Sequence, residues 1–480
     1  MCGVIGLFAD SPVAKDLCSG LLVIQHRGQD SAGIGTFDEK FHIRKGNGLV
    51  PQILSERSIA HFKGNMGIGQ VRYPTIGGGC SQDAQPFLVN SPYGILMVHN
   101  GNITNYYELK EELLTKNKRI LESENDVEVV LNVFADELAH QELNGLSPEQ
   151  VYNAVDGVFK RVKGAYSCIS IIAGKGMVAF RDPYGIRPLI MGRRGNEYAF
   201  VSETAALDYL GYTYVKDVGP GEVIFIDQQR KVHSKTVRHE KHHPCIFEII
   251  YFARPDSLID KISVYKSRLR MGTELAKLWK ESGFEADVVI PVPDTSRPAA
   301  LAFAEETGIK YREGFIKNKY VHRTFIMSSQ EKRTKSVKEK LNPLQLEIKG
   351  KNIAVVDDSI VRGTTSKKIV ELLRETGAKK VYFISSAPPL ISPCVYGIDM
   401  QTRKELIAHG KKMEEIKDYI GADGLIYQTI PGLIRACHEG NPEITQFCTA
   451  CFDGNYPTKD VTPDMLAQIE EKRSCKKQSS

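Results

Sequence analysis

The chain has 480 residues, a formal net charge of +5 and 42% hydrophobic residues. That length suits two or three domains with sizeable cores, and no uninterrupted apolar run approaches the roughly 20 residues of a membrane-spanning helix. The amino terminus lacks the basic region of a signal peptide, so we expect a cytoplasmic protein. Its ten cysteines should then serve as reduced thiols, metal ligands or catalytic groups rather than as disulfides.

A cysteine stands directly after the initiator methionine. Removal of Met1, which a small second residue permits, would make Cys2 the first residue of the chain. The α-amine of such a residue titrates at about pH 8 and can take the proton of its own thiol, directly or through water. Most cysteines near a terminus are inert, so Cys2 becomes a candidate nucleophile only in combination with further motifs.

Three polar, glycine-containing segments supply that combination. Gln25–Gly33 follows an apolar segment, and Gly69–Thr75 places Arg72 at the end of a predicted strand. His99–Asn105 comes after a predicted strand at Ile95–Val98. Together with the opening Met-Cys-Gly, these segments resemble the glutaminase domain of the class II amidotransferases, whose nucleophile is the amino-terminal residue.

The resemblance covers residues 2–234 and implies an α+β fold, the αββα sandwich of two antiparallel sheets between helices. It implies that Cys2 attacks the side-chain amide of glutamine. The Asn100 side chain and the Gly101 N–H would then bind the oxyanion of the tetrahedral intermediate, as preorganised donors do in such chemistry.

The same resemblance implies a binding site for the glutamine backbone groups. Arg72 would pair with the α-carboxylate as a bidentate fork, and Asp126 would hold the α-ammonium group. The family pattern around this aspartate commonly reads Ser-Asp-Ser-Glu, whereas the neighbours of Asp126 differ here. Tyr73, which follows Arg72, is expected to sense glutamine occupancy across the domain interface.

Two further segments before the second domain are interpreted as structural. Phe180–Leu189 predicts a turn between strands, and Ser202–Leu207 predicts an N-capped helix start. The polar, charged segment Gln228–His243 is predicted to be the linker between the domains.

The second domain begins with a predicted helix at Val264–Trp279 and a buried strand at Ala286–Pro291. Thr295 follows the carboxyl end of that strand, where open α/β sheets place their ligands. It is a candidate contributor to a magnesium and diphosphate site. A simple cap of the predicted helix Pro298–Glu305 is an alternative of nearly equal weight.

The basic charge of the chain is concentrated at Lys317–Lys340, where eight Lys and Arg residues stand against two Glu. A nucleic-acid-binding protein usually has a broader basic surface with aromatic residues, so we predict no nucleic-acid partner. A flap that is disordered without substrate and closes over a polyanionic ligand explains the segment, as does a solvated basic loop. Its candidate ligand contacts are Lys317, Arg323, Lys335 and Lys340.

A strand, a helix and a second strand follow in a βαβ arrangement. Ile353–Val356 predicts a buried parallel strand, Lys367–Thr376 a helix ended by Gly377, and Lys380–Ser385 the next strand. The hydroxyl-rich turn Arg362–Ser366 opens the helix, and backbone N–H groups at a helix start favour an anion.

Two adjacent carboxylates lie beside this predicted phosphate site. Asp357 and Asp358 would repel a phosphate, so they need vicinal sugar hydroxyls or a magnesium ion as partners. A phosphorylated ribose satisfies both the carboxylates and the turn, although a surface turn with capping hydroxyls is the alternative for the turn alone. The candidate contacts are Asp357, Asp358, Ser359, Arg362, Gly363, Thr364, Thr365 and Ser366, with Mg²⁺ at Thr295, Asp357 and Asp358.

This string resembles the phosphoribosyl diphosphate (PRPP) loop of the type I phosphoribosyltransferases, which implies an α/β domain over residues 235–455 and a tail at 456–480. The order of the two signatures resembles the amidophosphoribosyltransferase family over nearly the whole chain. That family converts glutamine, PRPP and water to 5-phosphoribosylamine, glutamate and diphosphate, the first committed step of purine biosynthesis. The resemblance also implies purine nucleotides as feedback inhibitors and a homo-oligomer, a tetramer.

Four cysteines remain grouped around the second domain. Cys448 and Cys451 form one C-x-x-C pair, and Cys245 and Cys394 are distant single residues. This spacing does not distinguish well between a zinc site and an iron–sulfur cluster site. A third interpretation is that these four cysteines are thiols that bind no metal. Some members of the family bind a [4Fe–4S] cluster through cysteines that match these four, so the resemblance implies a cluster that ties the tail to the core. The other cysteines are given no role.

A different class of function is a PRPP-sensing regulator with a vestigial glutaminase domain. It would need a nucleic-acid-binding module, and the sequence has neither a helix-turn-helix nor a zinc-finger signature. The string Val356–Ser366 also argues against an asparagine-synthetase-like or sugar-amidating partner domain. An enzyme with glutamine and PRPP as substrates is therefore the predicted function.

Overall fold

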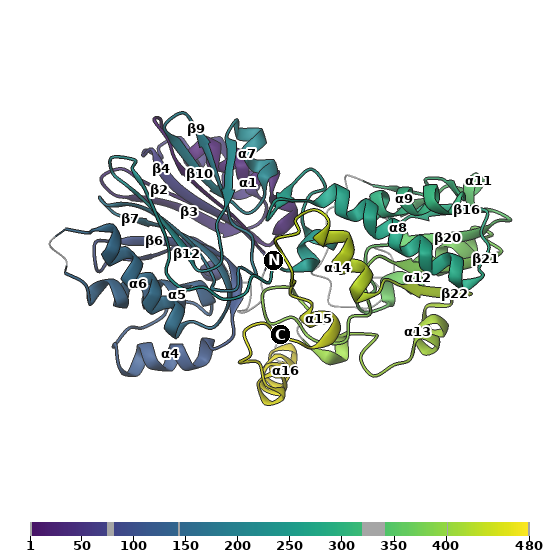
Figure 1. The fold of residues 1–480 in the computed structure, drawn as a ribbon. Coiled ribbons are helices and arrows are strands. Elements are labelled where there is room, and N and C mark those ends of the chain that lie inside the picture. The colour runs from purple at the N-terminus through teal and green to yellow at the C-terminus, as the bar shows by residue number, and fades with distance from the viewer. Residues whose placement is uncertain (1, 74–80, 143–144, 319–340, 401, 479–480) are drawn as a thin grey trace.

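The computed structural model describes residues 2–73, 81–142, 145–318, 341–400 and 402–478. Figure 1 shows two halves side by side, with two antiparallel sheets in the amino-terminal half and one parallel sheet in the carboxyl-terminal half. The predicted flap contacts Arg323, Lys335 and Lys340 lie outside the described residues.

The first sheet places the amino terminus in its centre. β1 is fully buried and pairs antiparallel with β10 on one side and β4 on the other. In spatial order its strands are β11 (Thr213–Asp217), β9 (Ile190–Arg194), β10 (Glu197–Val201), β1 (Gly3–Phe8), β4 (Met66–Arg72), β2 (Ser31–Phe37) and β3 (Phe41–Asn47).

The second antiparallel sheet packs face to face on the first. Its strands, in spatial order, are β13 (Val232–Thr236), β12 (Glu222–Asp227), β8 (Gly176–Arg181), β7 (Gly164–Ile172), β6 (Ile95–Ile103) and β5 (Phe87–Val89). Ile68 of the first sheet and Val98 and Ile169 of the second belong to the core between the sheets. β13 lies within the segment predicted as a linker, so the polar linker is shorter than the sequence predicts.

Helices cover the outer faces of both sheets. α1 (Ala14–Val23) and α7 (Thr204–Leu210) pack on the first sheet, and α5 (Asp126–Ala139) and α6 (Pro148–Arg161) pack on the second. The predicted αββα sandwich is confirmed. The shorter helices of this half are α2 (Val50–Ile53), α3 (Glu56–Ile59) and α4 (Tyr106–Thr115).

The parallel sheet of the second half has helices on both faces. Its strands, in spatial order, are β17 (Lys310–Tyr311), β16 (Val288–Pro291), β20 (Asn352–Asp357), β21 (Lys380–Ser385) and β22 (Gly424–Tyr427). Alternate residues of β20 face opposite ways: Ala354 and Val356 pack toward α8 (Val264–Ser282) and α9 (Arg297–Thr307). Ile353 and Val355 pack toward α12 (Thr364–Glu375) and α13 (Met413–Ile420). This arrangement confirms the predicted α/β domain.

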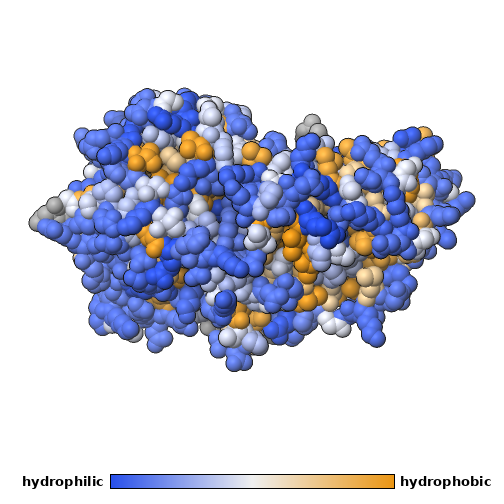
Figure 2. All heavy atoms as spheres, in the orientation of Figure 1, coloured by the Kyte–Doolittle hydropathy of each residue, from blue (hydrophilic) through white to orange (hydrophobic). Residues whose placement is uncertain are grey.

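Short elements complete the second half. They are β14 (Leu258–Ile259), β15 (Ile262–Ser263), β18 (Phe315–Lys317), β19 (Leu341–Pro343), α11 (Gln345–Ile348), α14 (Ile430–His438), α15 (Ala450–Asp453) and α16 (Pro463–Gln478). Among the described residues, no helix is long and apolar enough to cross a membrane. Figure 2 shows a largely hydrophilic face, on which hydrophobic residues gather over the region of α14 in Figure 1.

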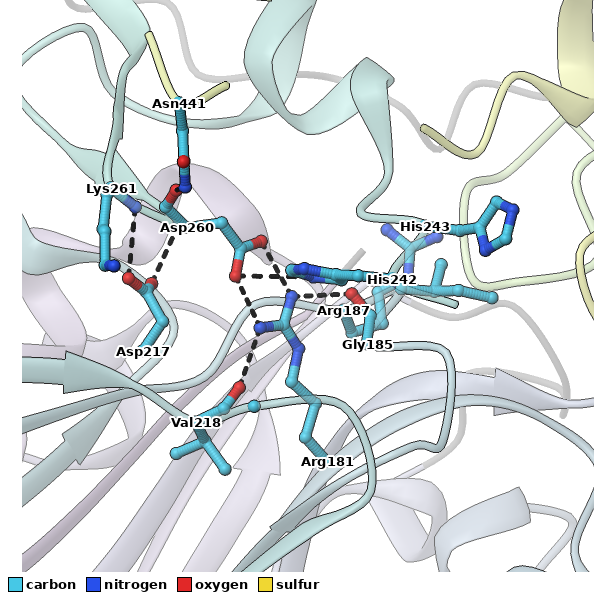
Figure 3. A network of polar contacts seen from close by, with 12 residues as sticks. Arg181, Gly185, Arg187, Asp217, Val218, His242, His243, Asp260, Lys261 and Asn441 are labelled. Carbon is cyan, nitrogen blue, oxygen red and sulfur yellow. Dashed lines mark hydrogen bonds and ion pairs between the residues drawn. The ribbon is translucent and has the colours of Figure 1, made fainter. Parts of the chain in front are cut away.

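A buried polar network joins the two halves (Figure 3). Arg181, at the end of β8, donates to both carboxylate oxygens of Asp260, at 2.7 and 2.9 Å. Asp260 lies in the turn between β14 and β15, and its N–H donates to the Asp217 carboxylate at 2.8 Å. Asn441 donates to the Asp260 carbonyl at 2.8 Å. Because Arg181 and Asp260 are both buried and share two hydrogen bonds, their pairing helps to fix how the halves sit together.

Candidate active sites

Cys2 lies immediately before the central strand β1 and is buried. Its N–H donates to Asn100 Oδ1 at 3.3 Å, and its carbonyl accepts from Arg27 Nε at 2.8 Å. Its thiol lies 3.7 Å from the carbonyl oxygen of Tyr73. Contacts to three other segments therefore fix the position of this cysteine.

Asn100 and Gly101 lie next to Cys2, within β6. The sequence prediction ended this strand at Val98 and was wrong, because the polar segment continues to pair with β7 as far as Ile103. Asn100 Nδ2 is buried and has no hydrogen-bond partner among the described residues. A Cβ atom on Gly101 would lie 2.0 Å from the Ala165 carbonyl oxygen, so only glycine fits there.

Arg72 and Asp126 provide opposite charges near these groups. Arg72 is the last residue of β4, as predicted, and Asp126 is the first residue of α5. The Asp126 carboxylate accepts from the Ile103 N–H at 3.1 Å and lies 3.3 Å from His99 Nε2. Burial alone would raise the pKa of Asp126, but His99, the Ile103 N–H and Arg72 together bring it below its ordinary value. The carboxylate is thus favoured in its charged form.

Asp83 is a neighbour that sequence reasoning missed. It is buried, and its Oδ2 lies 3.8 Å from Arg72 Nη1. Its carboxylate also accepts from the Glu124 N–H at 3.2 Å, and its carbonyl accepts from the Asn125 side chain at 2.6 Å. No local pattern marks Asp83, because its partners come from distant parts of the sequence.

A network of buried ion pairs contacts Cys2 through Arg27, which donates to the Cys2 carbonyl. Arg27 donates to Glu203 at 2.6 Å and to Glu248 at 2.8 Å, and all three side chains are almost fully buried.

Ser202–Leu207 was predicted as an N-capped helix start. α7 does begin at Thr204, but no side chain caps it, and the Ser202 hydroxyl instead accepts from the Val4 N–H at 2.9 Å.

The second candidate site lies at the carboxyl end of β20. Asp357 ends the strand and Asp358 follows, as predicted. Burial and the neighbouring Asp358 carboxylate raise the pKa of Asp357 well above its ordinary value. The Ser359 hydroxyl donates to Asp358 at 2.8 Å. A pair of crowded carboxylates of this kind gains from a cation or from hydroxyl donors.

The hydroxyl-rich turn next to it belongs to a helix. α12 begins at Thr364 rather than at the predicted Lys367, so Thr364, Thr365 and Ser366 form its first turn. Gly363 is the N-cap with φ +72°, and a Cβ there would lie 2.3 Å from Ile407 Cδ1. The start of a 12-residue helix leaves N–H groups available to an anion. Arg362 Nη2 lies 3.3 Å from Glu405 Oε1.

Thr295 and Lys317 lie near the same edge of the sheet. β16 pairs in parallel with β20, so the turn with Thr295 follows the strand end adjacent to Asp357. Ser296, not Thr295, is the N-cap residue of α9. Lys317 Nζ donates to Asp294 Oδ2 at 2.6 Å, which brings it to the Thr295 turn.

The structure brings Cys245, Cys394, Cys448 and Cys451 into one buried core. Cys245 and Cys448 form an isolated parallel bridge, in which the Cys448 N–H donates to the Pro244 carbonyl at 2.9 Å. Burial and the other three thiols raise the pKa of Cys451 well above its ordinary value. Among the described residues, no three His, Cys, Asp or Glu side chains are arranged to hold one metal ion.

A glutaminase sandwich joined to a phosphoribosyltransferase sheet defines the class of this protein, a two-domain glutamine-dependent transferase. Two family descriptions match it: a glutamine amidotransferase domain over residues 75–209 and a phosphoribosyl transferase domain over residues 264–419.

Relatives and solved structures match the chain over nearly its full length. Amidophosphoribosyltransferases of Pseudomonas aeruginosa and Escherichia coli are 50% and 48% identical, with 99% of this chain and 96% of each relative covered. That of Saccharomyces cerevisiae is 43% identical, with coverage of 98% and 95%. The glutamine PRPP amidotransferase from B. subtilis, complexed with ADP and GMP, has a TM-score of 0.85 at 39% identity and covers 95% of this chain and 97% of its own.

The chain belongs to the amidophosphoribosyltransferase family. It is an enzyme that uses glutamine, PRPP and water to form 5-phosphoribosylamine, glutamate and diphosphate, the first committed step of purine biosynthesis. The full-length match favours this activity over the PRPP-sensing regulator.

Proposed function

We propose that Cys2, once Met1 is removed, is the nucleophile that releases ammonia from glutamine. The observation that carries this proposal is the buried Nδ2 donor of Asn100, which has no partner among the described residues and belongs to the side chain that accepts from the Cys2 N–H. Buried donors are rarely left without a partner, so an atom of the substrate is the natural occupant.

The reaction then proceeds in two halves. The Cys2 thiol gives its proton to the α-amine and its sulfur bonds to the side-chain carbonyl carbon of glutamine, while the Asn100 amide and the Gly101 N–H hold the oxyanion. The C–N bond breaks as the nitrogen takes a proton and leaves as ammonia. Water hydrolyses the remaining thioester to glutamate and free Cys2. Arg72 holds the α-carboxylate and Asp126 the α-ammonium group throughout.

The second site transfers the ammonia to PRPP. The 5-phosphate binds at the start of α12, on Gly363, Thr364, Thr365 and Ser366, and the Asp357 and Asp358 carboxylates accept hydrogen bonds from the ribose hydroxyls. Ammonia bonds to C1 of the ribose as the C1–O bond to diphosphate breaks, through an oxocarbenium-like state.

Water must be excluded during this transfer, because protonated ammonia is not a nucleophile. The proposed flap, 317–340, closes over PRPP with Lys317, Arg323, Lys335 and Lys340 as contacts to its phosphates. In support, Lys317 already reaches Asp294 beside the Thr295 turn.

Mg²⁺ is the proposed metal of this site. Asp357, Asp358 and Thr295 would supply the oxygen ligands that Mg²⁺ prefers, and two crowded carboxylates gain from a nearby cation. When bound, the ion would neutralise charge on the leaving diphosphate.

A [4Fe–4S] cluster held by Cys245, Cys394, Cys448 and Cys451 is proposed as a structural cofactor. Burial and the thiols of Cys245, Cys394 and Cys448 raise the pKa of Cys451, so the four thiols lie close together, yet among the described residues they are not arranged around one ion. A cluster spreads its four cysteine ligands over four irons, so it suits a group of thiols that is not arranged around one ion better than a single zinc ion does. When bound, it would tie the tail to the core, so this chain is proposed to be of the iron–sulfur type.

Further properties are proposed from family membership. The relative from B. subtilis was solved with ADP and GMP, which supports purine nucleotides as ligands and feedback inhibitors here. We also propose a homotetramer in the cytoplasm, with domains at 2–234 and 235–455 and a tail at 456–480. Light scattering of the purified enzyme with and without nucleotides tests the assembly.

A Cys2→Ala variant tests the central proposal. We expect it to lose product formation with glutamine and to keep product formation with an ammonium salt, because the second site is untouched. Cys18→Ala, a half-buried cysteine of α1, is the matched control and should keep both activities. Glutamine turnover by Cys2→Ala would refute the nucleophile assignment.

Metal analysis of anaerobically purified protein tests the cofactor. A brown protein with iron and acid-labile sulfide in about equal amounts is expected of the cluster. A colourless protein that contains zinc would refute it.

A further inference from the structure

A segment of the second domain touches the proposed oxyanion site. Residues 394–400, called here the 394–400 segment, lie against the end of β6. Asn102 Nδ2 donates to the Val395 carbonyl at 2.8 Å, across 293 positions of the sequence. A Cβ on Gly397 would lie 3.1 Å from the carbonyl carbon and oxygen of Gly101. The backbone of Gly397 is thus packed on the backbone of Gly101.

The 394–400 segment is held from its other sides as well. Arg187, fully buried, donates through Nε to the Tyr396 carbonyl at 2.6 Å. The Cys394 N–H donates to the Met400 carbonyl at 2.7 Å, which closes the segment on itself. The Tyr396 hydroxyl lies 2.6 Å from the Thr458 hydroxyl. Since the segment is largely buried and is held at Tyr396 by Arg187 and Thr458, it cannot retreat easily from Gly101.

The same segment also reaches the other wall of the Cys2 site. The Tyr73 hydroxyl donates to Asp399 Oδ2 at 3.3 Å, and the Tyr73 carbonyl lies 3.7 Å from the Cys2 thiol. The 394–400 segment therefore touches both chain segments that flank Cys2.

We propose that the 394–400 segment is a positioning element of the glutaminase site, with Gly397 and Asn102 as positioning residues that hold Gly101 in register with Cys2. In this proposal both residues act through Gly101 and not on the substrate amide. The inference rests on the proposed oxyanion role of Asn100 and Gly101. It means that the glutaminase site is complete only when the second domain is folded against it.

Gly397→Ala is the direct test. Gly397 has φ +110° and its new Cβ would press on Gly101, whereas Gly410, with φ +73°, has no atom within 4 Å of a Cβ. Gly410→Ala therefore imposes left-handed backbone strain without the contact and is the matched control. A displacement of about 1 Å can cost about 100-fold in rate, so a shift of a few tenths of an ångström should lower kcat with glutamine about tenfold.

The pattern of the kinetic constants separates positioning from general damage. For Gly397→Ala we expect KM for glutamine close to wild type, an unchanged rate with ammonium salt, and slower alkylation of Cys2 by an electrophilic glutamine analogue. Gly410→Ala should match wild type in all of these. A wild-type kcat with glutamine, or an equal loss with glutamine and ammonium, would overturn the inference.

Asn102→Ala keeps the inference testable if Gly397→Ala does not fold. It removes the donor to Val395 and should also lower kcat with glutamine while it leaves the ammonium-dependent rate unchanged; a wild-type kcat would overturn the inference. Asn100→Ala, measured beside it, tests the proposed function. If Asn100→Ala keeps glutamine turnover, the oxyanion assignment is wrong. If it loses turnover and the other variants do not, only the positioning inference is wrong.

Discussion

Glu203→Gln removes one charge from the buried network beneath Cys2. Glu203 is fully buried, accepts from Arg27 at 2.6 Å, lies 2.8 Å from His26, and also accepts from the Arg254 N–H at 2.9 Å and the Ser257 hydroxyl at 3.0 Å. Removal of one partner of a buried ion pair typically costs about 3–5 kcal/mol, because the other charge stays buried.

The size of this loss in stability depends on the partners that Arg27 and the new side chain keep. Glu248 still accepts from Arg27 at 2.8 Å, which favours the lower end of that range. The new amide group, however, directs its own N–H donors toward groups that donate to Glu203, which adds about 1–3 kcal/mol for a buried group without a partner. We therefore expect a loss of about 4–6 kcal/mol in the free energy of unfolding.

The pH dependence has a defined sign. The pKa of Glu203 lies below its ordinary value of 4.5, because His26, Arg27 and the Arg254 N–H together outweigh burial. A depressed pKa stabilises the fold above 4.5, and this contribution is lost as the pH falls below that value. The difference between wild type and Glu203→Gln should therefore shrink on acidification.

Urea unfolding at several pH values provides the measurement. Far-UV circular dichroism reports both halves, and fluorescence of Trp279, the single tryptophan, reports α8 of the second half. Glu149→Gln is the control, because Glu149 pairs with Lys235 at 2.7 Å and both side chains are about half exposed. Such exposed pairs contribute about 0–1 kcal/mol. Equal, small losses for the two variants would refute the reasoning.

Three further outcomes are expected. Gly363→Ala places a Cβ 2.3 Å from Ile407 Cδ1 at φ +72°. It should cost at least about 1–2 kcal/mol and raise KM for PRPP but not for glutamine, in steady-state kinetics with each substrate varied. Asn125→Ala removes the side chain that caps α5 through the Val127 N–H, and should cost about 1 kcal/mol in thermal unfolding and raise KM for glutamine; an unchanged melting temperature would contradict this. Burial raises the pKa of Asp182 from 3.8 to about 6. The contribution of Asp182 to stability is then lost as the pH rises through about 6. The melting temperature of Asp182→Asn should therefore rise relative to that of wild type as the pH increases to about 6, and an unchanged difference between the two melting temperatures would contradict this.

Much of the second half could be predicted from local sequence. β21 has the predicted bounds, and β20 contains the predicted strand. Both succeeded because short β-branched runs between polar residues are typical of buried strands in a parallel sheet. The start of α12 was placed too late because Thr and Ser favour caps and turns in isolation. In the structure, Gly363 takes the N-cap position, and the hydroxyl residues lie inside the helix.

The first half shows why other parts escaped prediction. The polar segment His99–Asn105 was expected to follow a strand that ends at Val98, yet its residues as far as Ile103 lie in β6. Their backbone groups pair with β7, a partner that the local sequence does not reveal. The contacts of Asp83, Glu203 and Glu248 join segments far apart along the chain, so no spacing rule indicates them. The candidate Cys2, Asn100 and Gly101 were identified through resemblance, and their grouping in space came from the fold.

The group of four buried cysteines, Cys245, Cys394, Cys448 and Cys451, has a consequence for the biosynthesis of the chain. Its side chains come from residues 245, 394 and 448–451, and the Ile186 carbonyl of the first half accepts from the Cys245 N–H. Nearly the entire polypeptide must therefore be synthesised before the four thiols can come together. A nascent chain that ends before residue 448 contains only Cys245 and Cys394 of the four, so any group that all four thiols bind would be acquired late in biosynthesis.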